Sequence, residues 1–262
     1  MKTRKTYLPL LLPLMFSCLG CGNQSKTSYI GIVSAMDIEI DLLLEQAQIQ
    51  ETKKLGNVTM YAGTLKGKNV VISKAGVGKI NASSGITSVL HSYDLSKVIV
   101  SGVAGGVKDE EKVLDQVVGT KIVEHDYGYW GNDGFVWCGG DPGQKEPGEY
   151  YLCDPDLVEL AYQCSLEVVK DQQVFKGVIA TGDQFIASSE YVRYLDEEFD
   201  AYACEMEGAA IAKVCQAHDK PFVIMRTLSD KADGEAHETY ADFMDEAGDQ
   251  SSAIVLKMLE SI

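Results

Sequence analysis

The sequence predicts one layered α/β/α domain. Segments typical of buried strands alternate along the chain with segments typical of helices, a pattern that indicates a sheet covered by helices. About 240 residues follow the N-terminal segment, enough for one such domain with a substantial hydrophobic core. No internal repeat is found in the chain.

Each element has a local signal in the sequence. Strands are predicted from apolar, β-branched runs at 28–35, 58–65, 69–76, 97–102, 116–126, 174–182 and 221–230. Helices are predicted at 36–47, 78–93, 154–169 and 188–199 and at the C-terminus, where apolar residues from Tyr240 to Leu259 recur at steps of three and four. Segment 127–150 is rich in glycine, contains both tryptophans and is typical of a long loop.

The first 21 residues are typical of a bacterial export signal. Lys2, Arg4 and Lys5 precede a short apolar run, and the segment Cys18-Leu19-Gly20-Cys21 resembles a lipobox in which Cys21 is acylated. Cleavage before Cys18 and an ordinary secretory signal remain alternatives. We therefore expect a lipoprotein signal peptide at 1–21, a polar tether at 22–27, the folded domain at 28–262 and a location in the cell envelope.

The charge balance excludes some classes of partner. The chain has 23 basic and 39 acidic residues and a net charge of −16. Loss of the three basic residues of the signal segment leaves 20 basic residues and a net charge of −19. Such an excess argues against nucleic acid and against electrostatic binding to anionic lipid, so membrane attachment would depend on the acyl group alone.

The cysteines and histidines predict no metal site. Cys164, Cys204 and Cys215 lie among apolar residues, as small core side chains do. Cys138 and Cys153 flank a Gly/Pro-rich segment and could form a disulfide in an exported protein, but the sequence cannot fix their connectivity. Beyond the lipobox cysteines, no CxxC or paired His/Cys spacing suggests a metal site.

Glu205 and Glu207 bracket a methionine in the otherwise small and apolar segment ACEMEG at 203–208. One interpretation is a helix start, where acids favour the positive end of the helix dipole. The other is a carboxylate held in a pocket to bind a ligand. The residues alone leave both open.

Two glycine-rich turns follow strands, AGVGK at 75–79 and SGVAGGV at 101–107. Neither has the spacing of a P-loop or of a dinucleotide fingerprint. Both lie at carboxyl ends of predicted strands, where open α/β sheets bind ligands.

The order of these motifs is more specific than any one of them. GIVSAMDIEI, SKAGVGKINAS, VSGVAGGV, GDQFIAS, CEMEGAAIAKVC and RTLSDKAD, with a closing YADFM helix, resemble the 5′-methylthioadenosine/S-adenosylhomocysteine nucleosidases of the purine nucleoside phosphorylase-like superfamily. The resemblance covers about Ser28 to Ile262. It implies a three-layer α/β/α sandwich with a central mixed twisted sheet, a homodimer, no cofactor and no metal.

The resemblance also implies the chemistry. These enzymes hydrolyse the N-glycosidic bond of an adenosine thioether and release adenine and a thioribose. Asp230 matches the general acid at the purine, Glu39 the carboxylate that activates water, and Glu207 the residue that binds the ribose hydroxyls. Glu205 would then be a structural partner that helps hold the turn. Arg226 would orient the acids or the water. Breaking this bond passes through an oxocarbenium-like state, so acidic residues suit the site.

Further residues match the substrate pocket of the family. Phe185 would stack on the purine, Ile186 would read its edge through backbone groups, Met206 would pack beneath the sugar, and Ser229 accompanies the acid. Val77 would line the pocket.

The chain departs from the family pattern at Val103, where relatives commonly have a serine. The missing hydroxyl makes rate and water positioning uncertain. Segment 127–150 also diverges, so the preference between methylthioadenosine and S-adenosylhomocysteine is not readable. His125 is a candidate site residue or a structural histidine, whereas His91, His218 and His237 show no catalytic spacing.

Overall fold

The computed structural model describes residues 27–138 and 148–262. The predicted signal peptide, the lipidation site Cys21 and most of the tether lie outside the described residues. Within this part of the chain, no helix combines the length and the apolar character needed to cross a membrane.

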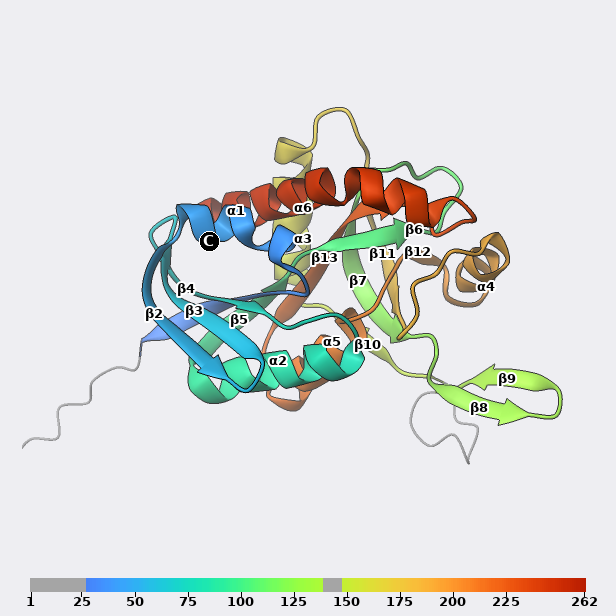
Figure 1. Ribbon diagram of the computed structural model, residues 1–262, viewed down its shortest axis with the longest axis horizontal. Coiled ribbons are helices and arrows are strands. Elements are labelled where there is room, and N and C mark those ends of the chain that lie inside the picture. Colours follow the sequence, from blue (N-terminus) through green and yellow to red (C-terminus); the bar gives the residue numbers. More distant parts are fainter. Residues whose placement is uncertain (1–26, 139–147) are drawn as a thin grey trace, which may run out of the picture.

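The described strands form one large mixed sheet and a separate hairpin (Figure 1). The sheet order is β10-β7-β11-β12-β6-β13-β5-β1-β4-β3-β2. The strand bounds are β1 Ser28–Ser34, β2 Gln48–Leu55, β3 Val58–Leu65, β4 Lys68–Lys74, β5 Asp94–Val100, β6 Val103–Gly106, β7 Gln116–Glu124, β10 Tyr150–Leu152, β11 Val174–Thr181, β12 Ala201–Glu205 and β13 Phe222–Asp230. The hairpin consists of β8 Gly128–Gly131 and β9 Gly134–Trp137.

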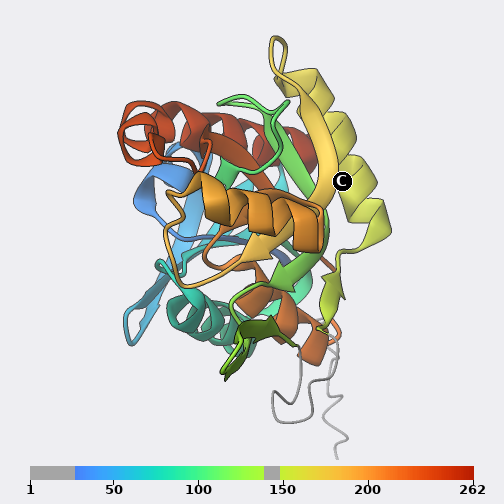
Figure 2. The same ribbon diagram turned by 90° about the vertical axis from the view of Figure 1, so that its right-hand side faces the viewer.

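Helices cover the sheet on two sides. The C-terminal helix α6 (Ala236–Ser261) packs with α1 (Asp41–Gln46) and α3 (Pro155–Val168), while α2 (Lys79–Ser92) packs with α5 (Gly208–Ala217) on the opposite side (Figure 1). Helix α4 (Ser189–Phe199) packs on β11 and β12, and Figure 2 shows it at the front of the molecule. The three-layer α/β/α architecture with a mixed sheet is therefore confirmed.

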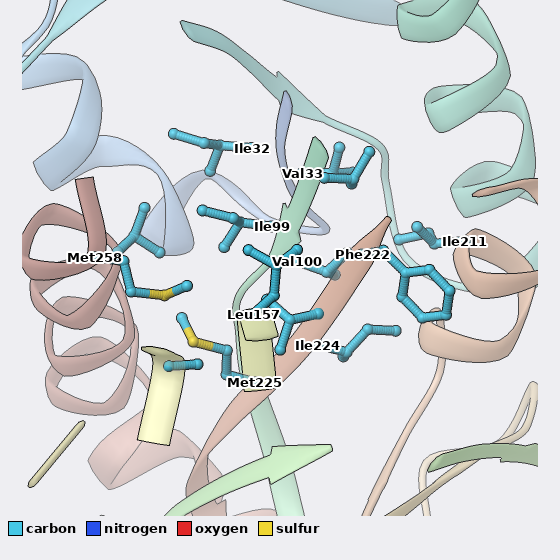
Figure 3. Packing of buried hydrophobic residues seen from close by; sticks show 14 of the residues in the cluster. Ile32, Val33, Ile99, Val100, Leu157, Ile211, Phe222, Ile224, Met225 and Met258 are labelled. Atoms are coloured by element: carbon cyan, nitrogen blue, oxygen red, sulfur yellow. The ribbon is translucent and has the colours of Figure 1, made fainter. Parts of the chain in front are cut away.

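The core lies on both faces of the central strands (Figure 3). Successive residues of a strand point to opposite faces, which is why the central strands are apolar along their length rather than alternating. In Figure 3, Ile99 lies on the side of Met258 in α6, whereas Phe222 lies beside Ile211 in α5. All four side chains are nearly inaccessible to solvent.

Strand β13 holds the two parts of the sheet together. Its first residues pair with β5, Met225–Thr227 pair antiparallel with β7, and Thr227–Asp230 pair with β6. Because β7 and β13 pair directly, the strands β7, β11, β12, β6 and β13 close into a ring. This closure was not predicted, since long-range pairing leaves no local sequence signal.

Two local predictions were wrong. Segment 127–150 is not one long loop, because its first part contains the β8–β9 hairpin and its last residue begins β10. Residues 139–147 of this segment lie outside the described residues. Figures 1 and 2 show the hairpin projecting from the body. The predicted helix 36–47 is instead a 3₁₀ turn at Asp37–Glu39 followed by the short α1. The outermost strand β2, exposed along its length, was also missed.

Cys138 and Cys153 are both free and buried. The structure therefore does not support the disulfide that the sequence left open.

Candidate active site

A cavity of about 400 Å³ lies where several strands end. Its walls come from the ends of β1, β6, β12 and β13, from the segment after β11 and from the start of α6. The lining residues are Ala35, Met36, Glu39, Val77, Val103, Ala104, Gly105, Gln184, Phe185, Ile186, Cys204, Glu205, Met206, Glu207, Ser229, Asp230, His237 and Tyr240. The three acids singled out from the sequence, distant in the chain, thus share one cavity.

Glu39 is held in the cavity wall by backbone groups. Its Oε2 accepts hydrogen bonds from the N–H groups of Ala35 at 2.7 Å and Met36 at 2.8 Å, and its Oε1 accepts one from Val103 at 3.0 Å. Burial raises the pKa of the Glu39 carboxyl above 4.5, against the opposing effects of the Arg226 charge and these hydrogen bonds. Glutamates in the first turn of a helix are usually exposed to solvent, whereas Glu39 is buried.

The ACEMEG segment is a strand–helix junction in which the two glutamates have different surroundings. Glu205 ends β12, and its oxygens accept hydrogen bonds from the N–H groups of Glu207 and Gly208, from the Thr181 hydroxyl and from Arg226. Both oxygens of the Glu205 carboxylate therefore already accept hydrogen bonds from protein groups. Glu205 thus fixes the turn into α5, as expected for a structural partner.

Glu207 lies at the start of α5 and faces the cavity with fewer bonds. Its Oε1 accepts a hydrogen bond of 2.8 Å from the N–H of Gly78, and its Oε2 lies 3.6 Å from Arg226. Burial, reinforced by the negative charge of Glu205, raises the pKa of Glu207 to about 8. The helix start therefore involves Glu205, while Glu207 lies in the pocket, as the second interpretation requires.

Arg226 lies in the middle of β13, behind the cavity. It is only 2% exposed, does not line the cavity and faces Glu39, Glu205 and Glu207. One guanidinium therefore offsets part of the charge of three carboxylates. This contact needs space at Gly102, where an added Cβ would lie 2.3 Å from Glu39 Oε1 and 2.8 Å from Arg226 Nη1.

Asp230 ends the same strand on the other side of the cavity. Its Oδ2 accepts a hydrogen bond of 2.9 Å from the Ser229 hydroxyl, and its Oδ1 accepts one of 2.8 Å from the N–H of Ala232. Burial raises the pKa of the Asp230 carboxyl above 3.8, against these two hydrogen bonds.

A sequence profile described as the phosphorylase superfamily matches residues 29–260. The chain belongs to this superfamily. A 5′-methylthioadenosine/S-adenosylhomocysteine nucleosidase of Bacillus cereus is 35% identical over 234 residues, which cover 89% of this chain and 99% of the relative.

Solved structures of superfamily members agree with this assignment. The nucleosidase of Neisseria meningitidis, in complex with methylthio-immucillin-A, has a TM-score of 0.80 and 32% identity over 90% of this chain and all of that one. Futalosine hydrolase of Helicobacter pylori has a TM-score of 0.81 and 31% identity over 90% of this chain and 99% of that one.

The other residues matched to the superfamily pocket also line the cavity. Val77, Ile186 and Met206 do so, and Phe185 makes an edge-on contact with Tyr240, with ring centroids 5.6 Å apart. Val103 contributes a backbone N–H to Glu39, a bond that does not depend on its side chain. The departure at Val103 therefore leaves the anchoring of Glu39 intact.

Sequence reasoning missed His237, Tyr240 and Gln184, which line the cavity. Tyr240 belongs to the apolar stripe of the terminal helix, so the helical pattern assigned it to the core. Its hydroxyl in fact contacts Met36 Sδ at 3.4 Å. His125 is not among the lining residues; it is buried, with Nδ1 3.1 Å from the Tyr191 hydroxyl.

Across residues 27–138 and 148–262, no group of three or more His, Cys, Asp or Glu side chains is placed to hold a metal ion. The cavity is lined by carboxylates, by the polar side chains of Gln184, Ser229, His237 and Tyr240 and by apolar side chains, and the Arg226 guanidinium lies behind it.

We predict that Glu207→Gln changes how stability depends on pH. Between its ordinary pKa of 4.5 and its folded-state pKa of about 8, the folded protein holds a proton at Glu207 that the unfolded chain has released. This contribution to stability is present below the unfolded pKa and is lost as the pH rises through the folded pKa. Glutamine does not titrate, so the variant should gain stability relative to the wild type as the pH rises over this window.

Urea unfolding at several pH values measures the difference. Glu190→Gln, at an exposed glutamate in the first turn of α4, is the matched control and should show no such trend. A Glu207→Gln difference that is constant across the window would refute the assignment.

Proposed function

We propose that this protein hydrolyses the N-glycosidic bond of 5′-methylthioadenosine, S-adenosylhomocysteine or both, releasing adenine and a thioribose. The observation that carries the proposal is the convergence of Glu39, Glu207 and Asp230 on one cavity in a chain that is similar to such nucleosidases along its length.

In this proposal Asp230 is the general acid. A carboxylic acid must stay protonated near neutral pH to donate to the leaving purine, and burial raises the pKa of Asp230 in the required direction. The hydrogen bonds from Ser229 and Ala232 fix both of its oxygens and so aim the carboxyl.

Glu39 activates the water that attacks the sugar. Its raised pKa makes it a stronger base than an exposed glutamate, and three backbone N–H groups hold its orientation. Arg226, which does not line the cavity, acts through the acids it faces.

The remaining residues bind the nucleoside. Glu207 accepts hydrogen bonds from the ribose hydroxyls, Met206 packs beneath the sugar, Phe185 and Ile186 contact the purine, and Val77 and Val103 complete the apolar wall. With Asp230 and Glu207 protonated, the carboxylates of Glu39 and Glu205 still outnumber the one guanidinium of Arg226, and this favours the sugar cation that forms as the bond breaks.

The lining favours hydrolysis over phosphorolysis. Among the described residues that line the cavity, none is a lysine or an arginine. A phosphate nucleophile would approach Glu39 without a positively charged cradle, and carboxylates repel it.

A second candidate is hydrolysis of futalosine, which the structural similarity to futalosine hydrolase favours. A third interpretation, raised by the export signal and Val103, is a nucleoside-binding lipoprotein without turnover.

The homodimer implied by the family resemblance is part of the proposal. Apolar side chains are exposed at or beside the cavity, with Val77 46% exposed, Phe185 47% and Ile80 81%, and Trp130 on the hairpin is 76% exposed. A second copy that covered them would remove apolar surface from water. Sedimentation showing only monomers at micromolar concentration would contradict this part.

The lipid anchor at Cys21 and the location in the cell envelope rest on the sequence alone. Expression in a bacterial host should place the protein in the membrane fraction, and Cys21→Ala should release it. Release by Cys18→Ala instead would favour cleavage at the earlier cysteine.

The function is tested by incubating purified protein with methylthioadenosine, S-adenosylhomocysteine, futalosine, adenosine and inosine, with and without phosphate. We expect adenine release from the adenosine thioethers in phosphate-free buffer. Dependence on phosphate would indicate a phosphorylase, preference for futalosine the second candidate, and tight binding without release a binding protein.

We predict that Asp230→Asn lowers kcat by at least about 100-fold, because asparagine cannot donate the proton, while methylthioadenosine binding changes little. Calorimetry measures binding and adenine release measures turnover. Asp242→Asn, at an exposed position of α6 outside the cavity lining, is the control and should keep most activity. An active Asp230→Asn variant would overturn the acid assignment.

A further inference from the structure

A cluster of charged side chains lies next to the ribose side of the cavity and has no part in the chemistry above. Lys79 Nζ forms ion pairs with Glu124 Oε1 at 2.7 Å and with Asp126 Oδ1 at 2.6 Å. Its side chain is only 18% exposed, so these pairs are less screened by solvent than surface pairs. Asp183 joins the cluster from the segment after β11.

Two adjacent backbone N–H groups at the start of α2 bind two different carboxylates. The N–H of Gly78 donates to Glu207 Oε1, and the N–H of Lys79 donates to Asp183 Oδ1, both at 2.8 Å. Gly78 has φ of 91°, and a Cβ there would lie 3.1 Å from Asp183 Oδ1, so the turn needs glycine. The same turn therefore holds Glu207 and Asp183 at once.

Asp183 directly precedes a segment that forms another part of the cavity wall. Gln184, Phe185 and Ile186 follow it directly and line the cavity, whereas Asp183 does not. The N–H of Asp183 donates to Asp126 Oδ2 at 2.8 Å, and Asp126 Oδ1 in turn pairs with Lys79. The three residues thus form a closed ring of hydrogen bonds. It runs from the Lys79 N–H to Asp183, from the Asp183 N–H to Asp126, and from the Lys79 ammonium back to Asp126.

We infer that Asp183 is a positioning residue that holds the purine-binding segment 184–186 at a fixed distance and orientation relative to Glu207. The inference rests on the proposed function for the identity of the ligand. A bound nucleoside would contact both parts of the wall. If either part were not already fixed in position, ordering it on binding would cost free energy and weaken affinity. The turn at Gly78 and Lys79 binds both Asp183 and Glu207 and so connects the two parts of the wall. Asp183 therefore acts through Phe185, Ile186 and Glu207 rather than by contacting the substrate.

Three variants test the inference. Asp183→Ala removes the acceptor for Lys79 N–H. Asp183→Asn keeps a side-chain oxygen that can accept this bond. Glu124→Gln is the matched control, because Glu124 pairs with the same Lys79 ammonium but lies outside the ring.

We expect Asp183→Ala to raise KM for methylthioadenosine about tenfold, the effect of losing one hydrogen bond to a charged group, and to change kcat less than about threefold. Asp183→Asn should restore most of the affinity, and Glu124→Gln should leave KM within about twofold of the wild type. Calorimetry of methylthioadenosine with the same variants, each combined with Asp230→Asn to suppress hydrolysis, should give Kd changes that parallel KM. A loss of stability alone would not produce this split between KM and kcat.

The inference is overturned if Asp183→Ala leaves Kd within twofold of the wild type, if it lowers kcat without weakening binding, or if Glu124→Gln weakens binding equally. Failure of the proposed function has a different signature, since the wild type itself would then release no adenine. The calorimetric comparison tests the role of Asp183 even then, with any of the nucleosides above that the wild type binds.

Discussion

The site depends on one buried arginine placed among three glutamates. Arg226 faces Glu39, Glu205 and Glu207, which come from the 3₁₀ turn after β1, the end of β12 and the start of α5. A buried guanidinium without carboxylates would be very costly, and so would three buried carboxylates without it. The ionic contacts therefore tie the two parts of the sheet to each other at the cavity.

The same arrangement leaves the site short of positive charge. Burial raises the pKa values of Glu39 and Glu207, and the negative charge of Glu205 raises that of Glu207 further. The single charge of Arg226 opposes these shifts without cancelling them. A substrate that develops positive charge would relieve this imbalance in the transition state more than in the ground state, which is the condition for catalysis. The burial of these carboxylates thus accounts both for their raised pKa values and for the proposed stabilisation of a sugar cation.

Several features of the site could be read from the chain because they are local. The small residues around ACEMEG favour a tight strand–helix junction, and the ordered motifs single out Glu39, Glu207 and Asp230, all of which line the cavity. The prediction of a long loop at 127–150 was wrong because glycines and aromatic residues are common in both loops and hairpins. Tyr240 and His237 were missed because the helical period of α6 does not distinguish a face on the core from a face on a cavity.

The sequence by itself determined the alternation of strands and helices, the apolar central strands and the family to which the motifs belong, since each follows from residue order and local periodicity. Only the tertiary structure decided which groups bind the carboxylates of Glu205 and Glu207, that Arg226 lies behind the wall, and that Asp183 shares a turn with Glu207. The physical reason is that these roles depend on desolvation and on hydrogen bonds between residues far apart in the chain, which exist only once β13 has paired with β5, β6 and β7.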